Sequence, residues 1–309
     1  MFGALAVPGV RAAQARPVIA MVLWRGESEA EQSFKAELDR MGYDIEYRVH
    51  DAGLSRAALA DILANRLKPG EASLVYVQGT FATLEVKKAL AGKTPLVFDV
   101  VRYPKRSGVV ANTDAPGKNV TGVHDRINPE DILAQAARLT PFTHVGLVYD
   151  VTASNARQEL LAVELYAEKA GFQVTAIGVQ PDALQLAAAL KNLARPELGV
   201  DLVYLPPDDF LGAHPELVGP FLAGLTVPSV ATLGDQVRMG ALYGLTPDLA
   251  ELGRLAAASA DKILRGAPAG SIPVAGPRTL RPMVNTATVK RLGLSLTPEQ
   301  LQGMVVVDR

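Results

Sequence analysis

Two neighbouring acidic residues follow an apolar run in the stretch LVYLPPDDF, residues 202–210. The apolar half predicts a buried strand, so Asp208 and Asp209 stand where that strand ends. No lysine or arginine lies close by in the chain to pair with them. An unpaired carboxylate at the mouth of a cleft favours a cation, and a ligand amine could supply one. Asp208 is therefore expected to contact a ligand, with Asp209 beside it; the alternative is that one of the two caps the next helix.

Polar and aromatic residues also follow other apolar runs. In open α/β sheets, ligands bind at the carboxyl ends of the strands, where the helices begin. Ser154 and Asn155 follow the run at 145–150 and could either bind a ligand or only cap a helix. The complete set of expected ligand-binding residues is Trp24, Arg25, Gln78, Gly79, Thr80, Phe81, Asn155, Asp208 and Asp209.

Each residue type in this set suggests a role. Gly79 and Thr80 open a helix, whose free N–H groups and positive dipole end favour a carboxylate. Trp24 and Phe81 could form an aromatic slot, and Arg25 could clamp an acidic group. The alternative for Trp24 is packing within its lobe.

The sequence carries no familiar catalytic constellation. It has no G-x-G-x-x-G after a strand, no P-loop, no G-x-S-x-G and no H-E-x-x-H. The histidines, residues 50, 124, 144 and 214, lack metal-ligand spacing, and cysteine is absent. We therefore expect no catalytic residue, no metal and no cofactor. An enzyme using Asp208 and Asp209 as acid and base is the alternative, but adjacent side chains rarely both face one substrate.

The apolar runs recur with a regular spacing. They begin at residues 18, 45, 74 and 96 and, after a loop, at 145, 174, 202 and 228. Successive runs start roughly 20–30 residues apart, the length of a strand plus a crossover helix. Between them lie amphipathic stretches, such as the one with Ala30, Phe34, Leu38 and Met41 at helical spacing. This pattern predicts an α/β fold with two doubly wound parallel-sheet lobes.

The later segments predict a chain that crosses back between the lobes. Residues 240–247 lead to a helix over 249–266, then to the runs SIPV and LRPMVN and a last helix near 286–292. The predicted division is 16–123 plus 244–275 for lobe 1 and 124–243 plus 276–309 for lobe 2, joined by a multi-strand hinge.

Residues 1–15, MFGALAVPGVRAAQA, are small and apolar and end in a small-x-small pattern. This is typical of the cleavage site of a signal peptide, although a charged n-region is missing; the alternative is an alanine-rich tail. No other stretch approaches the length of a membrane span. The chain is therefore expected to be exported, soluble and periplasmic, with no cysteine for a lipid anchor. Its net charge of −1, without a basic patch, argues against nucleic-acid binding.

Several motifs resemble one known family in their order and spacing. The strongest are PGKNVTGV at 116–123, VGLVYD at 145–150, DLVYLPPDD at 201–209 and VNTATVKRLGL at 284–294. From about Val18 to Leu294 the sequence resembles the ABC-transporter substrate-binding proteins of the tryptophan/tyrosine type. These have the type I periplasmic-binding fold, and described members bind aromatic amino acids such as tryptophan.

The resemblance implies that Thr80, Asn155 and Asp208 hold the α-carboxylate and α-amino group of an amino acid. It implies a monomer that carries a small ligand between two lobes to an ABC permease in the membrane. A sensor presenting the same module to another receptor is the alternative role. The sequence departs from the family pattern at Phe81 and Pro207, among other positions, so a different amino acid or a small aromatic carboxylate stays open as the ligand.

Overall fold

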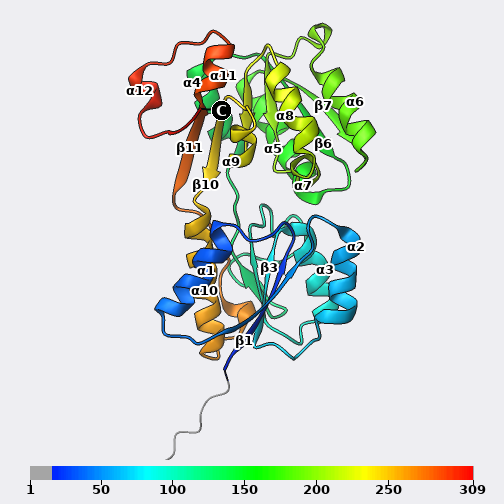
Figure 1. Cartoon of the computed structure of the whole chain (residues 1–309), viewed down its shortest axis with the longest axis vertical. Helices are drawn as coiled ribbons and strands as arrows, with labels where there is room; N and C mark the ends of the chain where they lie inside the picture. The colour runs from blue at the N-terminus through cyan, green and yellow to red at the C-terminus, as the bar shows by residue number, and fades with distance from the viewer. Residues whose placement is uncertain (1–15, 309) are drawn as a thin grey trace, which may run out of the picture.

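The structure is a computed structural model that describes residues 16–308. The predicted signal peptide, residues 1–15, lies outside the described residues. The described chain forms two α/β lobes joined by a narrow set of connections (Figure 1). The predicted fold class is confirmed.

Lobe 1 is built on a five-stranded sheet in the order β2-β1-β3-β4-β5, and all of its strand pairs are parallel. The strands are β1 (Val18–Leu23), β2 (Glu46–Asp51), β3 (Leu74–Gln78), β4 (Leu96–Asp99) and β5 (Val120–Gly122). The helices are α1 (Glu29–Arg40), α2 (Arg56–Asp61) with its continuation η1 (Ile62–Arg66), α3 (Thr80–Leu90), α10 (Leu249–Leu264) and η3 (Ala269–Ser271).

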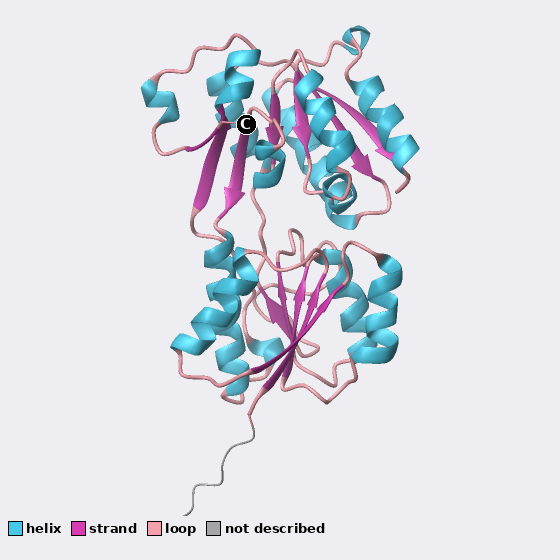
Figure 2. Ribbon diagram, viewed as in Figure 1, coloured by secondary structure: helices cyan, strands magenta, loops and turns pink. Residues whose placement is uncertain are grey.

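The sheet of lobe 1 is buried on both faces, which explains its uninterrupted apolar runs. In β1, Met21 packs in the cluster with Phe34 of α1, whereas Val22 packs in the opposite cluster with Val86 of α3. Figure 2 shows helices on both sides of the sheet. On the α1 side, α10 approaches so closely that a Cβ on Gly253 would come within 2.0 Å of the carbonyl oxygen of Ala30.

Lobe 2 is built on a seven-stranded sheet in the order β12-β11-β10-β9-β8-β6-β7, in which only the β10–β11 pair is antiparallel. The strands are β6 (His144–Asp150), β7 (Gln173–Val179), β8 (Leu202–Leu205), β9 (Ser229–Ala231), β10 (Tyr243–Pro247), β11 (Leu280–Asn285) and β12 (Val305–Val307). The helices are α4 (Pro129–Leu139), α5 (Ser154–Ala170), α6 (Ala183–Leu193), η2 (Pro196–Leu198), α7 (Asp209–Gly212), α8 (Pro215–Gly224), α9 (Gly234–Arg238), α11 (Thr286–Arg291) and α12 (Pro298–Leu301).

The chain passes between the lobes after β5, again between β10 and α10, and again between η3 and β11. Two of these segments lie side by side, because Val123 forms a bridge with Ala275 and the N–H of His124 donates to the Ala275 carbonyl. The predicted boundary at residue 244 needs a correction. Residues 244–247 belong to β10, which pairs with β9 and β11 in the second sheet.

Within residues 16–308, no helix combines the length and the apolar character needed to cross a membrane.

Candidate functional site

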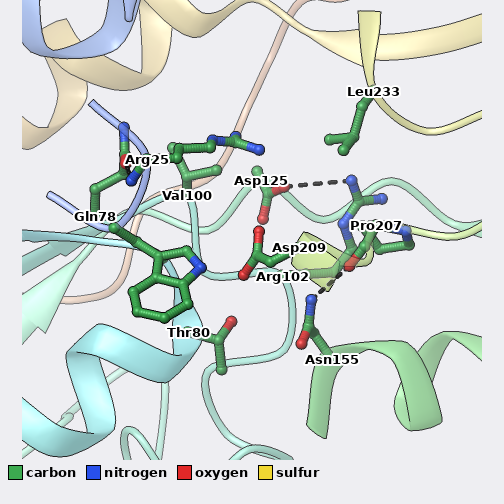
Figure 3. Close-up of a pocket in the computed structure, with 12 residues that line it drawn as sticks. Arg25, Gln78, Thr80, Val100, Arg102, Asp125, Asn155, Pro207, Asp209 and Leu233 are labelled. Atoms are coloured by element: carbon green, nitrogen blue, oxygen red, sulfur yellow. Dashed lines mark hydrogen bonds and ion pairs between the residues drawn. The ribbon is translucent and has the colours of Figure 1, made fainter. Parts of the chain in front are cut away.

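The carboxyl ends of β1, β3, β6 and β8 lead into a cleft between the lobes. Its central chamber brings charged and amide side chains together with apolar ones. The residues that line it are Trp24, Arg25, Gln78, Gly79, Thr80, Val100, Arg102, Asp125, Asn155, Pro207, Asp209 and Leu233 (Figure 3). All of the predicted site residues except Phe81 and Asp208 are in this set.

An outer chamber adjoins the central one and shares Trp24, Thr80, Asn155 and Asp209 with it. Its wall is largely apolar and aromatic, and it includes Leu54, Phe81, Leu84, Pro181, Phe210, Ala213 and His214. The cleft therefore places a chamber with several charged side chains beside a largely apolar one.

The N-terminus of α3 opens onto both chambers. Gly79 precedes the helix with a φ of 87°, a conformation that favours glycine, and a Cβ there would contact Trp24. The N–H of Gly79 donates to the carbonyl of Asp99, and no side chain caps the helix. The first turn of α3 consequently presents N–H groups to the cleft beside the buried Thr80.

Gln78 supports the loop after β1. Its amide nitrogen donates to the carbonyl of Gly26 at 3.1 Å and to Glu31 at 2.9 Å, and its amide oxygen accepts the N–H of Arg25 at 3.1 Å. The side-chain amide is therefore used within the protein, and Gln78 fixes the loop that carries Trp24 and Arg25.

Trp24 and Phe81 make an edge-to-face pair with ring centroids 5.0 Å apart. The guanidinium of Arg56 lies 4.5 Å from the Phe81 ring. The expected aromatic pair therefore exists, and Trp24 is buried while its ring still borders both chambers.

The N-terminus of α5 enters the cleft from lobe 2, and it too lacks a side-chain cap. Asn155 in its first turn donates its amide to the carbonyl of Pro207 at 2.5 Å, which ties α5 to the segment after β8. Asn155 and Thr80 thus line the same chamber from opposite lobes (Figure 3).

The prediction that Asp208 lacks a partner in the protein is wrong. Its fully buried carboxylate caps α7, accepting the N–H groups of Phe210 at 2.9 Å and Leu211 at 3.4 Å. It also accepts the N–H of Asp150 at 2.6 Å. These bonds turn the carboxylate towards the backbone, and Asp208 does not line either chamber.

Asp209 has the open position instead. Its carboxylate lines both chambers and makes no hydrogen bond or ion pair to any residue between 16 and 308. Burial raises the pKa of Asp209, the positive charge of Arg25 opposes this rise and the negative charge of Asp125 adds to it. Because Asp208 and Asp209 point to different surroundings, the pair cannot act as acid and base on one substrate.

Sequence patterns do not identify two charged residues of the central chamber, Arg102 and Asp125. Arg102 lies in the irregular segment after β4 and Asp125 in the crossing segment after β5, so neither follows a periodic pattern. Both are buried, and they form an ion pair at 3.3 Å. Close by, Val100 has a φ of 55°, a strained conformation for a β-branched residue. Such strain often accompanies functional sites, but sequence alone does not reveal it.

Within the described part of the chain, no group of three or more histidine, aspartate or glutamate side chains is placed to hold a metal ion.

The family model described as ABC transporter substrate binding protein matches residues 17–304. A curated tyrosine-binding protein from Clostridioides difficile is 24% identical over 233 residues, which cover 75% of this chain and 66% of that protein. The match therefore spans slightly less than two thirds of that relative's length.

Solved structures show the same fold. An ABC domain from Streptococcus pneumonia in complex with L-Trp has a TM-score of 0.83 at 21% identity, covering 95% of this chain and 100% of that one. A ligand-free, open substrate-binding protein from Clostridium difficile has a TM-score of 0.72 at 20% identity, covering 94% and 99%.

Proposed function

Because the chain belongs to the ABC transporter substrate-binding proteins, we propose that it binds an amino acid with an aromatic side chain in this cleft. The observation that carries the proposal is the Asp209 carboxylate, which has no partner among the described residues and lies beside two uncapped helix N-termini. An α-amino acid supplies the complementary charges in one small group.

The polar end of the ligand fits the central chamber. Its ammonium pairs with Asp209, and its carboxylate accepts N–H groups from the first turns of α3 and α5, near Thr80 and Asn155. These contacts come from both lobes, so the ligand stabilises the closed arrangement.

The side chain of the ligand fits the outer chamber. Phe81, Phe210 and His214 offer aromatic faces there, and Trp24 stands between the two compartments. Burying an aromatic side chain against such a wall supplies apolar contact and ring–ring interactions. The tyrosine-binding relative and the neighbour with bound L-Trp support this ligand class.

The proposed role places the mature chain in the periplasm, where it would act as a monomer and deliver its ligand to a membrane permease. It serves as a carrier with no catalytic step of its own. The signal-like residues 1–15 support export.

Isothermal titration calorimetry with the twenty amino acids tests the proposal. We expect the tightest binding for tryptophan, tyrosine or phenylalanine, and much weaker binding for alanine and aspartate. Equal affinity for all of them, or no binding to any, would contradict the proposed ligand.

A further inference from the structure

Buried side-chain atoms without hydrogen bonds gather in the central chamber. In residues 16–308 such atoms occur on Trp24 (Nε1), Arg102 (Nε and Nη1), Asp125 (Oδ1) and Tyr47 (hydroxyl). All of these residues except Tyr47 line the central chamber. Since buried polar groups are almost always hydrogen-bonded, this gathering marks a place where a bound molecule supplies the partners.

The carboxylate of Asp125 is only half used by the protein. Its Oδ2 accepts a hydrogen bond from Arg102 Nη2 at 3.3 Å, whereas its Oδ1 has no donor. The side chain is buried, with a residue exposure of 4%, so bulk water does not solvate the free oxygen. A donor from the ligand would complete it.

Asp125 and Asp209 face the same space. Figure 3 shows their carboxylates directed towards one another across the chamber. The negative charge of Asp125 contributes to the raised pKa of Asp209, which agrees with this proximity. Two facing carboxylates repel each other, and a cation held between them removes the repulsion.

We propose that Asp125 is a second carboxylate partner for the ammonium of the ligand, opposite Asp209, and that Arg102 is the residue that positions it. This inference rests on the proposed function, because it requires a ligand with an amine. It goes beyond that function by assigning the recognition of the amine to a residue of the segment that joins the lobes.

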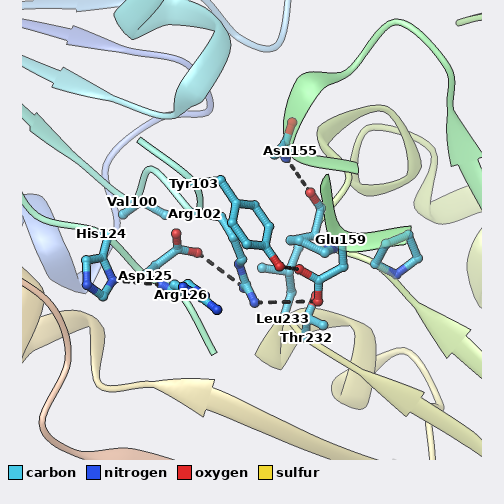
Figure 4. Close-up of polar contacts among 12 residues, drawn as sticks. Val100, Arg102, Tyr103, His124, Asp125, Arg126, Asn155, Glu159, Thr232 and Leu233 are labelled. Atoms are coloured by element: carbon cyan, nitrogen blue, oxygen red, sulfur yellow. Dashed lines mark hydrogen bonds and ion pairs between the residues drawn. The ribbon is translucent and has the colours of Figure 1, made fainter. Parts of the chain in front are cut away.

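Arg102 follows β4 of lobe 1 and is held between the crossing segment and lobe 2, which allows it to orient Asp125. It is 2% exposed and pairs with Asp125 on one side and, at 4.0 Å, with Glu159 of α5 on the other (Figure 4). Glu159 in turn accepts the hydroxyl groups of Tyr103 at 2.7 Å and Tyr204 at 2.5 Å. The chain of contacts therefore links the ammonium site to the interface between the lobes.

The test compares each of L-tryptophan and L-tyrosine with its analogue that lacks the amine, indole-3-propionate and 3-(4-hydroxyphenyl)propionate. Loss of the amine should weaken binding to the wild-type protein by about 100-fold. In Asp125→Asn this ratio should fall to about tenfold or less, because one of the two carboxylates is gone. A merely structural role for Asp125 would weaken both ligands equally and leave the ratio unchanged, which would overturn the inference.

Asp44→Asn is the matched control, because the Asp44 side chain is 83% exposed, lies away from the cleft and, among residues 16–308, pairs only with Arg16. It should leave both affinities and their ratio unchanged. If Asp125→Asn does not fold, Asp209→Asn gives the complementary test: about tenfold discrimination for the amine should persist through Asp125. Complete loss of discrimination in Asp209→Asn would overturn the inference.

The two proposals fail in different ways. If the wild-type protein binds none of the four compounds, the proposed amino-acid ligand is wrong, and the inference falls with it. If the amino acids bind but the ratio of their affinity to that of the amine-free analogues is the same in wild type and Asp125→Asn, the proposed function stands and the proposed role of Asp125 is wrong.

Discussion

The N-terminus of α7 and the N-termini of α3 and α5 all lie near the same cleft, but the protein caps only the first with a side chain. Asp208 accepts two N–H groups of α7, whereas α3 and α5 begin without any side-chain cap. A missing cap is not confined to these two helices, because α4 and α8 also begin without a side-chain cap, whereas α1 and α10 begin with caps from Ser28 and Asp248. At the two chambers, the protein therefore satisfies the start of α7 with its own carboxylate and leaves the first N–H groups of α3 and α5 available to a ligand.

Asp208 and Asp209 show the same difference between a carboxylate that the protein uses and one that it leaves without a partner among the described residues. The first carboxylate serves the fold, and the second is left for a cation. Substitutions at the two positions should therefore have opposite signatures, one in stability and the other in binding.

Asp209→Asn should weaken ligand binding and leave the stability of the fold almost unchanged. We expect the affinity for the preferred aromatic amino acid to fall by about tenfold, because an ammonium in the closed cleft loses one of its two charged partners. Calorimetric titration measures the affinity, and chemical denaturation should show an almost unchanged free energy of unfolding. An unaltered affinity in a folded variant would remove Asp209 from the site.

Asp208→Ala should lower the stability of the fold. Loss of the acceptor for three backbone N–H groups should lower the free energy of unfolding by about 2 kcal/mol. The control is Asp182→Ala, which removes an exposed cap with one acceptor bond and should cost about 1 kcal/mol or less. A large loss of affinity in Asp208→Ala, with stability unchanged, would reverse the assignment of the two aspartates.

The pH dependence of stability sharpens the role of Asp208. Burial raises the pKa of this group from 3.8 to about 7, although hydrogen bonds from the N–H groups of Asp150 and Phe210 oppose the rise. The folded state therefore binds the Asp208 proton more tightly than the unfolded state does. Protonation of Asp208 thus stabilises the folded protein fully below about pH 4, and this stabilisation is lost as the pH rises through about 7.

Unfolding free energies of the wild type and Asp208→Asn, measured across this range, provide the test. Between about pH 4 and pH 8 the wild type should lose stability relative to the variant, by up to roughly 1 kcal/mol per pH unit. A difference that does not change with pH would contradict the raised pKa.

Phe81→Leu should have the smallest effect and concerns the apolar chamber. Loss of the ring removes the contact with Trp24 and one aromatic face for the ligand. Affinity for aromatic amino acids should fall by about three- to tenfold, since such ring pairs contribute about 1 kcal/mol. Phe172→Leu, in a ring cluster of lobe 2 away from the chambers, should change stability but not affinity. Equal affinity losses in the two variants would remove Phe81 from the ligand site.

The strands and helices could be predicted because parallel strands buried on both faces produce apolar runs that need no tertiary information. The first run, from Val18, and the helix containing Phe34 both occur where the pattern placed them. The run at 240–247 was harder to assign, because β10 pairs with β9 in one lobe and leads directly to α10 in the other.

The site could be predicted only in part. The position of Trp24, Thr80 and Asn155 at the cleft could be predicted, because they follow strands at the edge where ligands bind in α/β sheets. Sequence could not show that Asp209 rather than Asp208 faces the cleft, because this depends on which of the two residues caps α7. Arg102 and Asp125 come together only in the folded chain, from irregular segments on either side of β5.

Native mass spectrometry most directly tests the central claim, that the Asp209 carboxylate binds the ammonium group of an aromatic amino acid. The protein would be incubated with an equimolar mixture of tryptophan, tyrosine and their analogues without the amine, indole-3-propionate and 3-(4-hydroxyphenyl)propionate, whose masses all differ clearly. We expect a one-to-one complex whose added mass is that of an aromatic amino acid. A complex with an analogue that lacks the amine, or no complex at all, would contradict it.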